Sequence, residues 1–323
     1  MYAWQVLVVV QIRVVLGDFW ALLVAGSRGI ANYRHQADLC HTYGLLTGSM
    51  HVDPSHVVTM MYDDVAWSDA NPLVGRLFNE PNGVNVYEDC NIDFGRSKVT
   101  VANFQKILAG QSSVSVQSNA ESTVFLSFVD HGEPGSLLLP SGEALSGESI
   151  LQAINAMNNR FKRLVIYVEA CFAGSVFERI QLPANVIAIT ASNSTESSWG
   201  TFCPTPQHPG ADEVNGVHIG ACLGDLFEVS WKRDLETRDD WATATFGDHV
   251  EAVKSIVARK SHVMVYGDRS LLSQPLSNIF PPIVSGSKKN GAFSDTLLIE
   301  SAVQQRAMAA NPETARHDTI IAA

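Results

Sequence analysis

The sequence is poor in charged side chains. Asp, Glu, Lys and Arg make up 17% of its 323 residues, against roughly 25% in an average soluble domain. No run of basic residues is longer than a pair, and 33 acidic against 22 basic residues give a net charge of −11. A surface of this kind repels a nucleic-acid backbone on average, so we expect no DNA or RNA partner.

The sequence also lacks a hydrophobic run long enough to cross a membrane. A spanning helix needs roughly 18 apolar residues, and the apolar stretch from Val6 to Leu16 is interrupted by Gln11 and Arg13. We therefore expect no membrane span. Residues 1–19 are predicted to be either an N-terminal arm or a weak signal segment.

Hydrophobic residues are abundant, at 46% of the chain, which is enough for a packed core at this length. Apolar runs bounded by Gly, Asp or Asn alternate with segments of helical period, a pattern typical of a parallel sheet with helices on its faces. This predicts the α/β class. The predicted strands are 20–25, 57–62, 124–129, 164–168 and 186–190, with a short arm at 137–139, and the predicted helices are 35–46, 100–108, 147–161 and 248–258.

The predicted organisation is one domain of catalytic size over 20–282 followed by a tail over 283–323. The segments 71–91 and 203–222 are rich in Pro, Gly and Asn and are predicted to be irregular. A helical stretch at 297–309 is expected to be detached from the sheet domain.

Two of the predicted strands end in reactive residues. An Asp-His-Gly triplet at 130–132 follows one strand and a Glu-Ala-Cys triplet at 169–171 follows the next. Ligands of open α/β sheets bind at the carboxyl ends of the strands, so we expect His131 and Cys171 to meet at one edge. An imidazole beside a thiol is the minimum for nucleophilic acyl transfer, with Gly132 and the Cys171 backbone N–H as candidate oxyanion site. On spacing alone, a structural cysteine and a loop histidine are the competing interpretation.

Longer strings of residues surround these positions. In chain order they include Asn32-Tyr33-Arg34-His35-Gln36-Ala37-Asp38, Met61-Tyr62-Asp63-Asp64, Asp130-His131-Gly132, Glu169-Ala170-Cys171, Glu196-Ser197-Ser198 and Leu223-Gly224-Asp225. Together they resemble the legumain family of asparaginyl endopeptidases, the C13 family of cysteine proteases, over about 20–267.

The resemblance implies a caspase-like fold, a mostly parallel sheet flanked by helices on both faces. It implies cleavage of peptides and proteins after Asn, more slowly after Asp, at acid pH, and in some members transpeptidation or ligation. No cofactor and no metal are implied. Cystatin-type inhibitors are implied as partners, and a lysosome, vacuole, other endomembrane compartment or secretion as the location.

The resemblance implies roles for individual residues of this sequence. Cys171 matches the nucleophile, His131 the catalytic base and Asn32 the residue that orients the histidine. Asp130 matches a position that can cyclise to a succinimide. The matches to the pocket for the substrate Asn side chain are Arg34, His35, Glu169 and Asp225, with Ser197 and Ser198 at its edge.

The pocket residues agree with the chemistry of a carboxamide. That group offers one acceptor and two donors, so a guanidinium on one side and carboxylates on the other satisfy both ends. An aspartate in the same pocket would be repelled by the acids unless it is protonated, which favours low pH.

Plainer interpretations exist for several residues. Arg34 and Asp225 on their own make a structural ion pair. Glu169, at the end of an apolar strand, is expected to have a cationic partner if it is buried. Asp63 and Asp64 are predicted to cap a loop rather than bind a metal.

Five cysteines leave at least one thiol outside any internal disulfide. Cys40 is predicted to pack in the core and Cys90 to be a free thiol in a loop. The number and type of ligands for a Cys2His2 zinc site are present in Cys203, His208, His218 and Cys222. The resemblance favours a disulfide between Cys203 and Cys222 instead.

The sequence departs from the family pattern in three places. Ile30-Ala31 replaces an aromatic pair, and Phe172 replaces a small or acidic residue after the nucleophile. In the tail, only 294–316 resembles the linker of the family prodomain, and Asn290-Gly291 is a predicted self-cleavage site. Asn193-Ser194-Thr195 is a glycosylation sequon.

Two other functions compete with an asparaginyl endopeptidase. One is the catalytic subunit of the glycosylphosphatidylinositol transamidase, which needs membrane partners and usually a membrane helix. The other is a relative that binds peptides without cleaving them, against which the complete set of Asn32, His131 and Cys171 argues.

Overall fold

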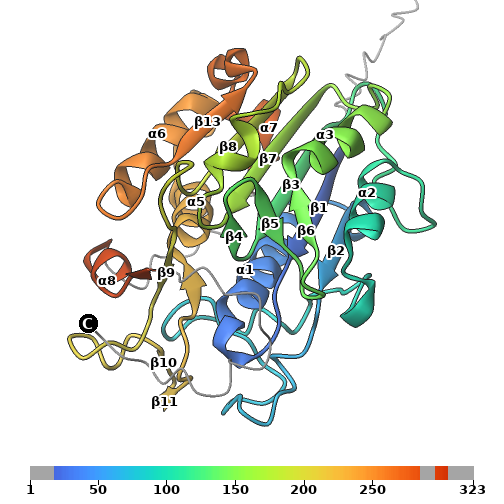
Figure 1. Ribbon diagram of the computed structural model, residues 1–323. Coiled ribbons are helices and arrows are strands. Elements are labelled where there is room, and N and C mark those ends of the chain that lie inside the picture. The colour runs from blue at the N-terminus through green and yellow to red at the C-terminus, as the bar shows by residue number, and fades with distance from the viewer. Residues whose placement is uncertain (1–17, 284–294, 305–323) are drawn as a thin grey trace, which may run out of the picture.

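A six-stranded sheet forms the centre of the computed structural model, which describes residues 18–283 and 295–304 (Figure 1). The strand order is β13-β8-β7-β3-β1-β2; β13 is antiparallel to β8 and the other neighbours are parallel. The strands are β1 (Phe19–Ala25), β2 (Val57–Met61), β3 (Thr123–Val129), β7 (Arg163–Glu169), β8 (Val186–Thr190) and β13 (Met264–Gly267). Every residue of β2, β3 and β8 is buried. Burial on both faces explains why these strands are continuous apolar runs.

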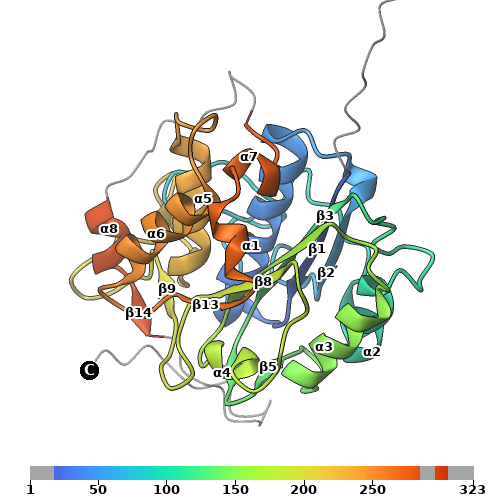
Figure 2. The same cartoon turned by 90° about the horizontal axis from the view of Figure 1, so that it is seen from above.

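Helices cover both faces of this sheet, as Figure 2 shows from above. One face carries α1 (Tyr33–Gly44), α5 (Leu226–Thr237) and α6 (Phe246–Val257), with the short α7 (Leu276–Ile279). The other face carries α2 (Val101–Leu108), α3 (Gly147–Ala156) and α4 (Gly174–Phe177). The predicted mostly parallel α/β sheet with helices on both faces is confirmed.

One predicted helix is too long. Helix α3 ends at Ala156, whereas the apolar period predicts 147–161. Asn158 and Asn159 adopt positive φ angles of 50° and 57°, a left-handed conformation that asparagine tolerates and that ends a helix. Phe161 is nevertheless buried, because the chain folds back onto the same core.

Three small sheets lie outside the central one. β4 (Gly132–Glu133), β5 (Ser136–Leu138) and β6 (Ala144–Ser146) form an antiparallel meander directly after β3. β9 (Trp199–Thr201) pairs with β12 (Gly224–Asp225) on one side and with β14 (Val303–Gln304) on the other. β10 (Glu213–Val214) and β11 (Val217–His218) form a hairpin within the segment predicted to be irregular.

Part of the tail is docked rather than detached. Helix α8 (Asp295–Glu300) and β14 lie against β9: the Thr201 hydroxyl donates to the Leu298 carbonyl at 2.5 Å, and the Phe202 N–H donates to the Ser301 hydroxyl at 3.1 Å. The expectation of a detached helix is wrong here because Leu298 is fully buried in the core. The predicted N-terminal arm to residue 17, the cleavage site at 290–291 and the tail beyond residue 304 lie outside the described residues.

Two disulfides tie loops to the domain. Cys203 is bonded to Cys222, so neither sulfur is available for the Cys2His2 zinc site. Cys40 is bonded to Cys90, which corrects the prediction of a core thiol and a free thiol. Cys40 does pack in the core, but the loop carrying Cys90 packs on that same core and brings the two sulfurs together. Among the described residues, no helix is long and apolar enough to cross a membrane.

Candidate active site

The predicted catalytic residues follow three neighbouring strands. β3 pairs with β1 on one side and with β7 on the other, so the segments after their carboxyl ends share one edge of the sheet. Asn32 lies in a 3₁₀ turn after β1, His131 follows β3 and Cys171 follows β7. All three side chains are buried, which screens them from bulk water.

The orientation of Asn32 determines which nitrogen of His131 carries the proton. The Asn32 amide Nδ2 donates to the Arg28 carbonyl at 2.9 Å, so its Oδ1 must face the imidazole. That oxygen lies 2.8 Å from His131 Nε2. An amide oxygen can only accept, so Nε2 carries the hydrogen and Nδ1 of the neutral ring keeps its lone pair.

His131 Nδ1 is therefore the basic atom of the site. It has no hydrogen-bond partner within the described ranges. Burial, followed by the positive charge of Arg34, lowers the pKa of His131 to about 3. The imidazole is accordingly neutral, and able to accept a proton, throughout the mildly acidic range.

Cys171 is a buried thiol outside both disulfides. Its Sγ lies 4.0 Å from the Ser198 hydroxyl oxygen. Gly132 packs directly on this residue: a Cβ at position 132 would lie 2.2 Å from the Cys171 carbonyl oxygen. Only glycine permits this approach of β4 to the nucleophile. Phe172, with a φ of 55°, donates its N–H to the Glu196 carbonyl at 2.8 Å and fixes the turn after Cys171.

The predicted pocket residues lie together beside this edge. Arg34 Nε donates to Asp225 Oδ1 at 2.8 Å, and His35 Nε2 lies 3.5 Å from Asp225 Oδ2. Glu169 is fully buried at the end of β7. Gly200 packs against the guanidinium, since a Cβ there would lie 3.3 Å from Arg34 Nε. The ion pair of the plainer interpretation is thus real, and it forms one wall of the candidate pocket.

Burial raises the pKa values of both acids at the candidate pocket. Burial, and then the nearby Asp225 carboxylate, raises the pKa of Glu169 well above its usual range, while a hydrogen bond from Ser198 opposes the shift. Burial also raises the pKa of Asp225, against the opposing charge of Arg34. Burial is therefore the largest influence on the pKa of Glu169, and the Asp225 carboxylate adds to it.

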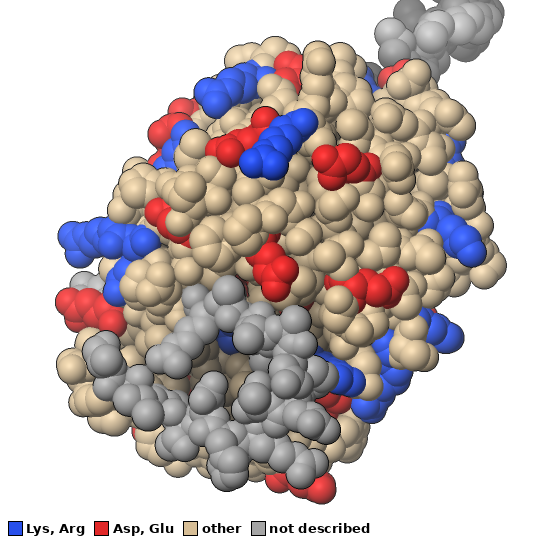
Figure 3. Space-filling model, viewed as in Figure 1, with Lys and Arg blue, Asp and Glu red and all other residues tan. Residues whose placement is uncertain are grey.

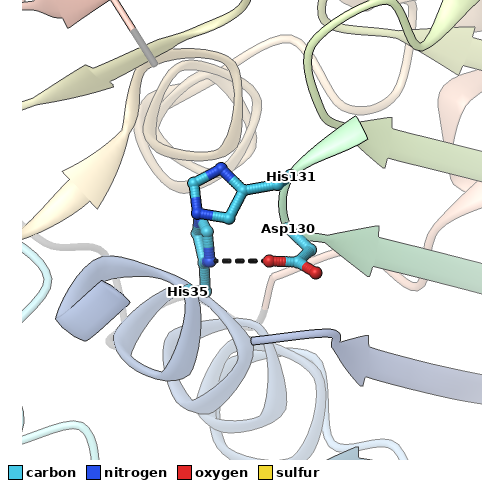
Figure 4. Close-up of side chains that lie close together, drawn as sticks. All are labelled: His35, Asp130 and His131. Carbon is cyan, nitrogen blue, oxygen red and sulfur yellow. Dashed lines mark ion pairs between the residues drawn. The ribbon is translucent and has the colours of Figure 1, made fainter. Parts of the chain in front are cut away.

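A second cluster lies behind the histidine, as Figure 4 shows. His35 Nδ1 lies 3.2 Å from Asp130 Oδ1 and 2.6 Å from the Ser27 hydroxyl, and the His35 and His131 rings meet edge to face at 5.0 Å. Burial lowers the pKa of His35 and raises that of Asp130, so it favours the neutral form of both. Ligand atoms of His35, Asp130 and His131 lie within 4.8 Å of one another, but Nδ1 of His35 is already engaged by its neighbours.

The remaining residues singled out in the sequence are Ser197, Asp63 and Asp64. Ser197 is half-buried in the loop before β9, one residue ahead of Ser198. Asp63 accepts a hydrogen bond from the Tyr87 hydroxyl, and Asp64 accepts from the Gly29 N–H and from the Gln36 side chain, so this pair holds loops together.

Two buried residues behind the pocket, Asp38 and Lys232, were missed by sequence reasoning. Asp38 accepts from the backbone N–H of Asp225 at 2.9 Å. A signal did exist: Glu228 and Lys232 stand four residues apart on a helix among apolar residues, which marks a buried charge pair. The Arg28 carbonyl that orients Asn32 has no such signal, because any residue supplies a carbonyl.

A thiol and an imidazole that follow neighbouring parallel strands of a helix-covered sheet define a caspase-like cysteine peptidase fold. Residues 19–293 match the Peptidase C13 family. The chain belongs to this family, and the resemblance to legumain is confirmed.

Sequence similarity to curated proteins supports this family assignment. The chain is 38% identical over 276 residues to the vacuolar-processing enzyme delta-isozyme of Arabidopsis thaliana. It is 36% identical over 277 residues to the legumain of Canavalia ensiformis, and 40% identical over 256 residues to the hemoglobinase of Schistosoma mansoni. The matches cover 81%, 81% and 77% of this chain and 58%, 57% and 56% of the relatives. The chain thus spans little more than half the length of these relatives.

Proposed function

We propose that this chain is a cysteine endopeptidase that hydrolyses peptide bonds after Asn, and more slowly after Asp, at acid pH. The observation that carries the proposal is the hydrogen-bond chain from the Arg28 carbonyl through Asn32 to His131. It leaves Nδ1 as a neutral base on the edge where the Cys171 thiol follows β7.

In the first half of the reaction, His131 Nδ1 takes the proton of the Cys171 thiol. The thiolate attacks the scissile carbonyl carbon, and the oxyanion forms beside the backbone around Gly132. The C–N bond then breaks, and Nδ1 returns its proton to the leaving amine. In the second half, a water molecule gives a proton to Nδ1 and attacks the thioester, releasing the acid and the thiol. Asn32 keeps the proton on Nε2 throughout.

The pocket formed by Arg34, Glu169 and Asp225 suits a side-chain carboxamide. The guanidinium can donate to the carboxamide oxygen, and the acids can accept from its two N–H groups. An Asp side chain brings no donor unless it is protonated, and its charge meets that of Asp225. We therefore assign the acid preference of Asp cleavage to this pocket.

Transpeptidation or ligation is a second part of the proposal, and a succinimide at Asp130 is a separate part on which the ligase claim does not rest. Burial raises the pKa of Asp130, and its carboxyl accepts a hydrogen bond from the backbone N–H of His131. Attack of that nitrogen on the Asp130 carboxyl carbon, with loss of water, would form the succinimide that the resemblance implies. Mass spectrometry of the intact protein would reveal it as a loss of one water.

Cleavage assays test the main proposal directly. Purified protein is offered fluorogenic peptides with Ala-Ala-Asn, Ala-Ala-Asp or Ala-Ala-Lys before the fluorophore, at about pH 5.5 and about pH 7.5. We expect cleavage after Asn at both values, after Asp only at the lower value and after Lys at neither. Equal cleavage of all three, or of none, contradicts the proposal. Cys171→Ser should abolish turnover and leave the circular dichroism spectrum unchanged.

We further propose a location in a vacuole, lysosome or other endomembrane compartment, or outside the cell. Two internal disulfides favour an oxidising environment, and several relatives are named vacuolar-processing enzymes. A fluorescent fusion of the full-length protein that is confined to the cytosol would contradict this.

A further inference from the structure

A fully buried ion pair lies directly behind the candidate pocket. Lys232 Nζ, on α5, donates to Asp38 Oδ1 at 2.9 Å and to the Asp38 carbonyl at 3.1 Å. Neither side chain is exposed to solvent. The two residues are 194 positions apart in the sequence, so the pair joins α1 to α5 at the wall of the site.

The backbone of Asp225 connects the pair to the candidate pocket. The Asp225 N–H donates to Asp38 Oδ2 at 2.9 Å, while Asn79 Nδ2 donates to Asp38 Oδ1 at 3.0 Å. Asp38 therefore accepts from Lys232, Asn79 and Asp225 at once. This arrangement suits a carboxylate, because each of its two oxygens faces at least one donor.

The surrounding charges come from four elements. The titratable and charged groups around the pair are Arg34 and His35 of α1, Glu169 of β7, Asp225 of β12 and Glu228 of α5, with His41 reached through Asn79. Arg34 offsets Asp225, and Lys232 offsets Asp38. Burial raises the pKa of Glu228 to about 7 and that of Glu169 well above its usual range. Two buried cations, Arg34 and Lys232, thus face four buried acids, and removing one charged member changes the charge of the whole cluster.

We propose that Asp38 and Lys232 are positioning residues that hold the Asp225 backbone and balance the charge behind the pocket, and that this balance sets the preference for a carboxamide over a carboxylate side chain at the cleavage site. The inference rests on the proposed function and extends it to residues that touch no substrate. Removing Lys232 leaves Asp38 without its cation, and removing Asp38 leaves Lys232 with Glu228 as its acidic partner, so either change alters the net charge of a buried site. A carboxylate substrate senses that charge, and a carboxamide does not.

The two members of the pair therefore make opposite predictions. Asp38→Asn leaves the Lys232 charge and should raise the ratio of kcat/KM for Ala-Ala-Asp over Ala-Ala-Asn about tenfold at about pH 6. Lys232→Met leaves the Asp38 charge and should lower the same ratio about tenfold. Tenfold corresponds to about one pKa unit, the effect of one charge at about 10 Å with an effective dielectric constant of about 20.

Matched variants separate charge from folding. The double variant Asp38→Asn/Lys232→Met restores balance and should return the ratio to within about threefold of wild type, as should Lys232→Arg. Glu228→Gln replaces an acid that is protonated at this pH and should leave the ratio unchanged. A folding defect would lower both activities without moving the ratio. Ratios that do not move, or that move in the same direction in both single variants, overturn the proposal.

A second measurement needs no turnover. In protein with 13C-labelled Asp and Glu carboxyls and the Cys171→Ser substitution, Glu169 and Asp225 should titrate at lower pH in Asp38→Asn and at higher pH in Lys232→Met. If Lys232→Met does not fold, Asp38→Asn alone decides, and unchanged titration there overturns the proposal. A wild-type chain that cleaves no peptide contradicts the proposed function but still permits this titration, so the two failures are distinguishable.

Discussion

The helices on the two faces of the central sheet bury different kinds of side chain. Helices α2 and α3, on one face, bury apolar side chains and a glycine. Helices α1 and α5, on the other face, also bury Arg34, Asp38, Glu228 and Lys232. We call these the apolar face and the polar face. Ionisable groups are costly to bury, so their concentration beside the candidate pocket is consistent with the proposal that this face serves chemistry as well as stability.

On the face of the molecule drawn in Figure 3, the basic and acidic side chains are scattered among uncharged ones. The charges that distinguish the two faces of the sheet are interior ones. Substitutions in the interior should reveal the difference, and we order them by the size of the expected effect.

The largest effect is expected from the disulfide that anchors a long loop to α1 on the polar face. Removing it by Cys40→Ala/Cys90→Ala should lower the free energy of unfolding by about 4 kcal/mol, because it closes a loop with a sequence separation of 50. Cys203→Ala/Cys222→Ala, with a separation of 19, should cost about 3 kcal/mol. Urea unfolding without reductant measures both. A larger loss for the shorter loop would contradict the entropic explanation.

The pH dependence of stability should distinguish the faces. Folding raises the pKa of Glu228 to about 7, from an ordinary value of 4.5, mainly by burial. The folded state therefore holds a proton that the unfolded state releases, and this contribution is complete below about pH 4.5 and lost as the pH rises through about 7. Glu228→Gln should gain about 3 kcal/mol relative to wild type between about pH 4 and about pH 8.

Ile154→Ala is the matched substitution on the apolar face. Ile154 is buried on α3, and its truncation should cost about 3 kcal/mol at both pH values because an apolar cavity exchanges no proton. Unfolding curves for the two variants at both pH values make the comparison. If the free energy of unfolding of wild type and of Glu228→Gln depends on pH in the same way, Glu228 does not take up a proton on folding as proposed.

Asn32→Ala should reduce kcat about 100-fold, the usual scale for a misplaced catalytic group. Without the amide oxygen, the proton of His131 is no longer confined to Nε2. Nitrogen NMR of the imidazole should show the change of tautomer, while KM for the Asn peptide stays near wild type. Asn155→Ala, exposed on α3 of the apolar face, is the control and should leave kcat unchanged. A kcat near that of wild type for Asn32→Ala would remove Asn32 from the mechanism.

The apolar face could be predicted from the sequence far better than the polar face. Continuous apolar runs predict the strands, and the spacing of Phe104, Ile107 and Leu108 predicts α2, because burial there depends only on local periodicity. The position of the site follows from the rule that ligands bind at the carboxyl ends of strands. The identity of the pocket residues came from family resemblance, since no local pattern relates Arg34 to Asp225.

Several of the missed features depend on contacts between distant segments. The Cys40–Cys90 bond, the docking of Leu298 and the Asp38–Lys232 pair each join parts of the chain that tertiary folding alone brings together. The lysine at position 232 is visible in the sequence, but its partner Asp38 is not. The polar face is harder to predict because pairs such as Arg34–Asp225 and Asp38–Lys232 join different elements.

Helix capping should be the same on both faces, and it gives the smallest expected effect. Thr100 caps α2 by accepting from the Asn103 N–H at 3.2 Å, and Thr245 caps α6 by accepting from the Asp248 N–H at 3.1 Å. Thr100→Ala and Thr245→Ala should each cost about 1 kcal/mol of unfolding free energy. Thr245→Ala should cost slightly more, because Thr245 also donates to the Asp248 carboxylate. If thermal melts show Thr100→Ala to be several times more costly, the faces differ in backbone stability as well as in buried charge.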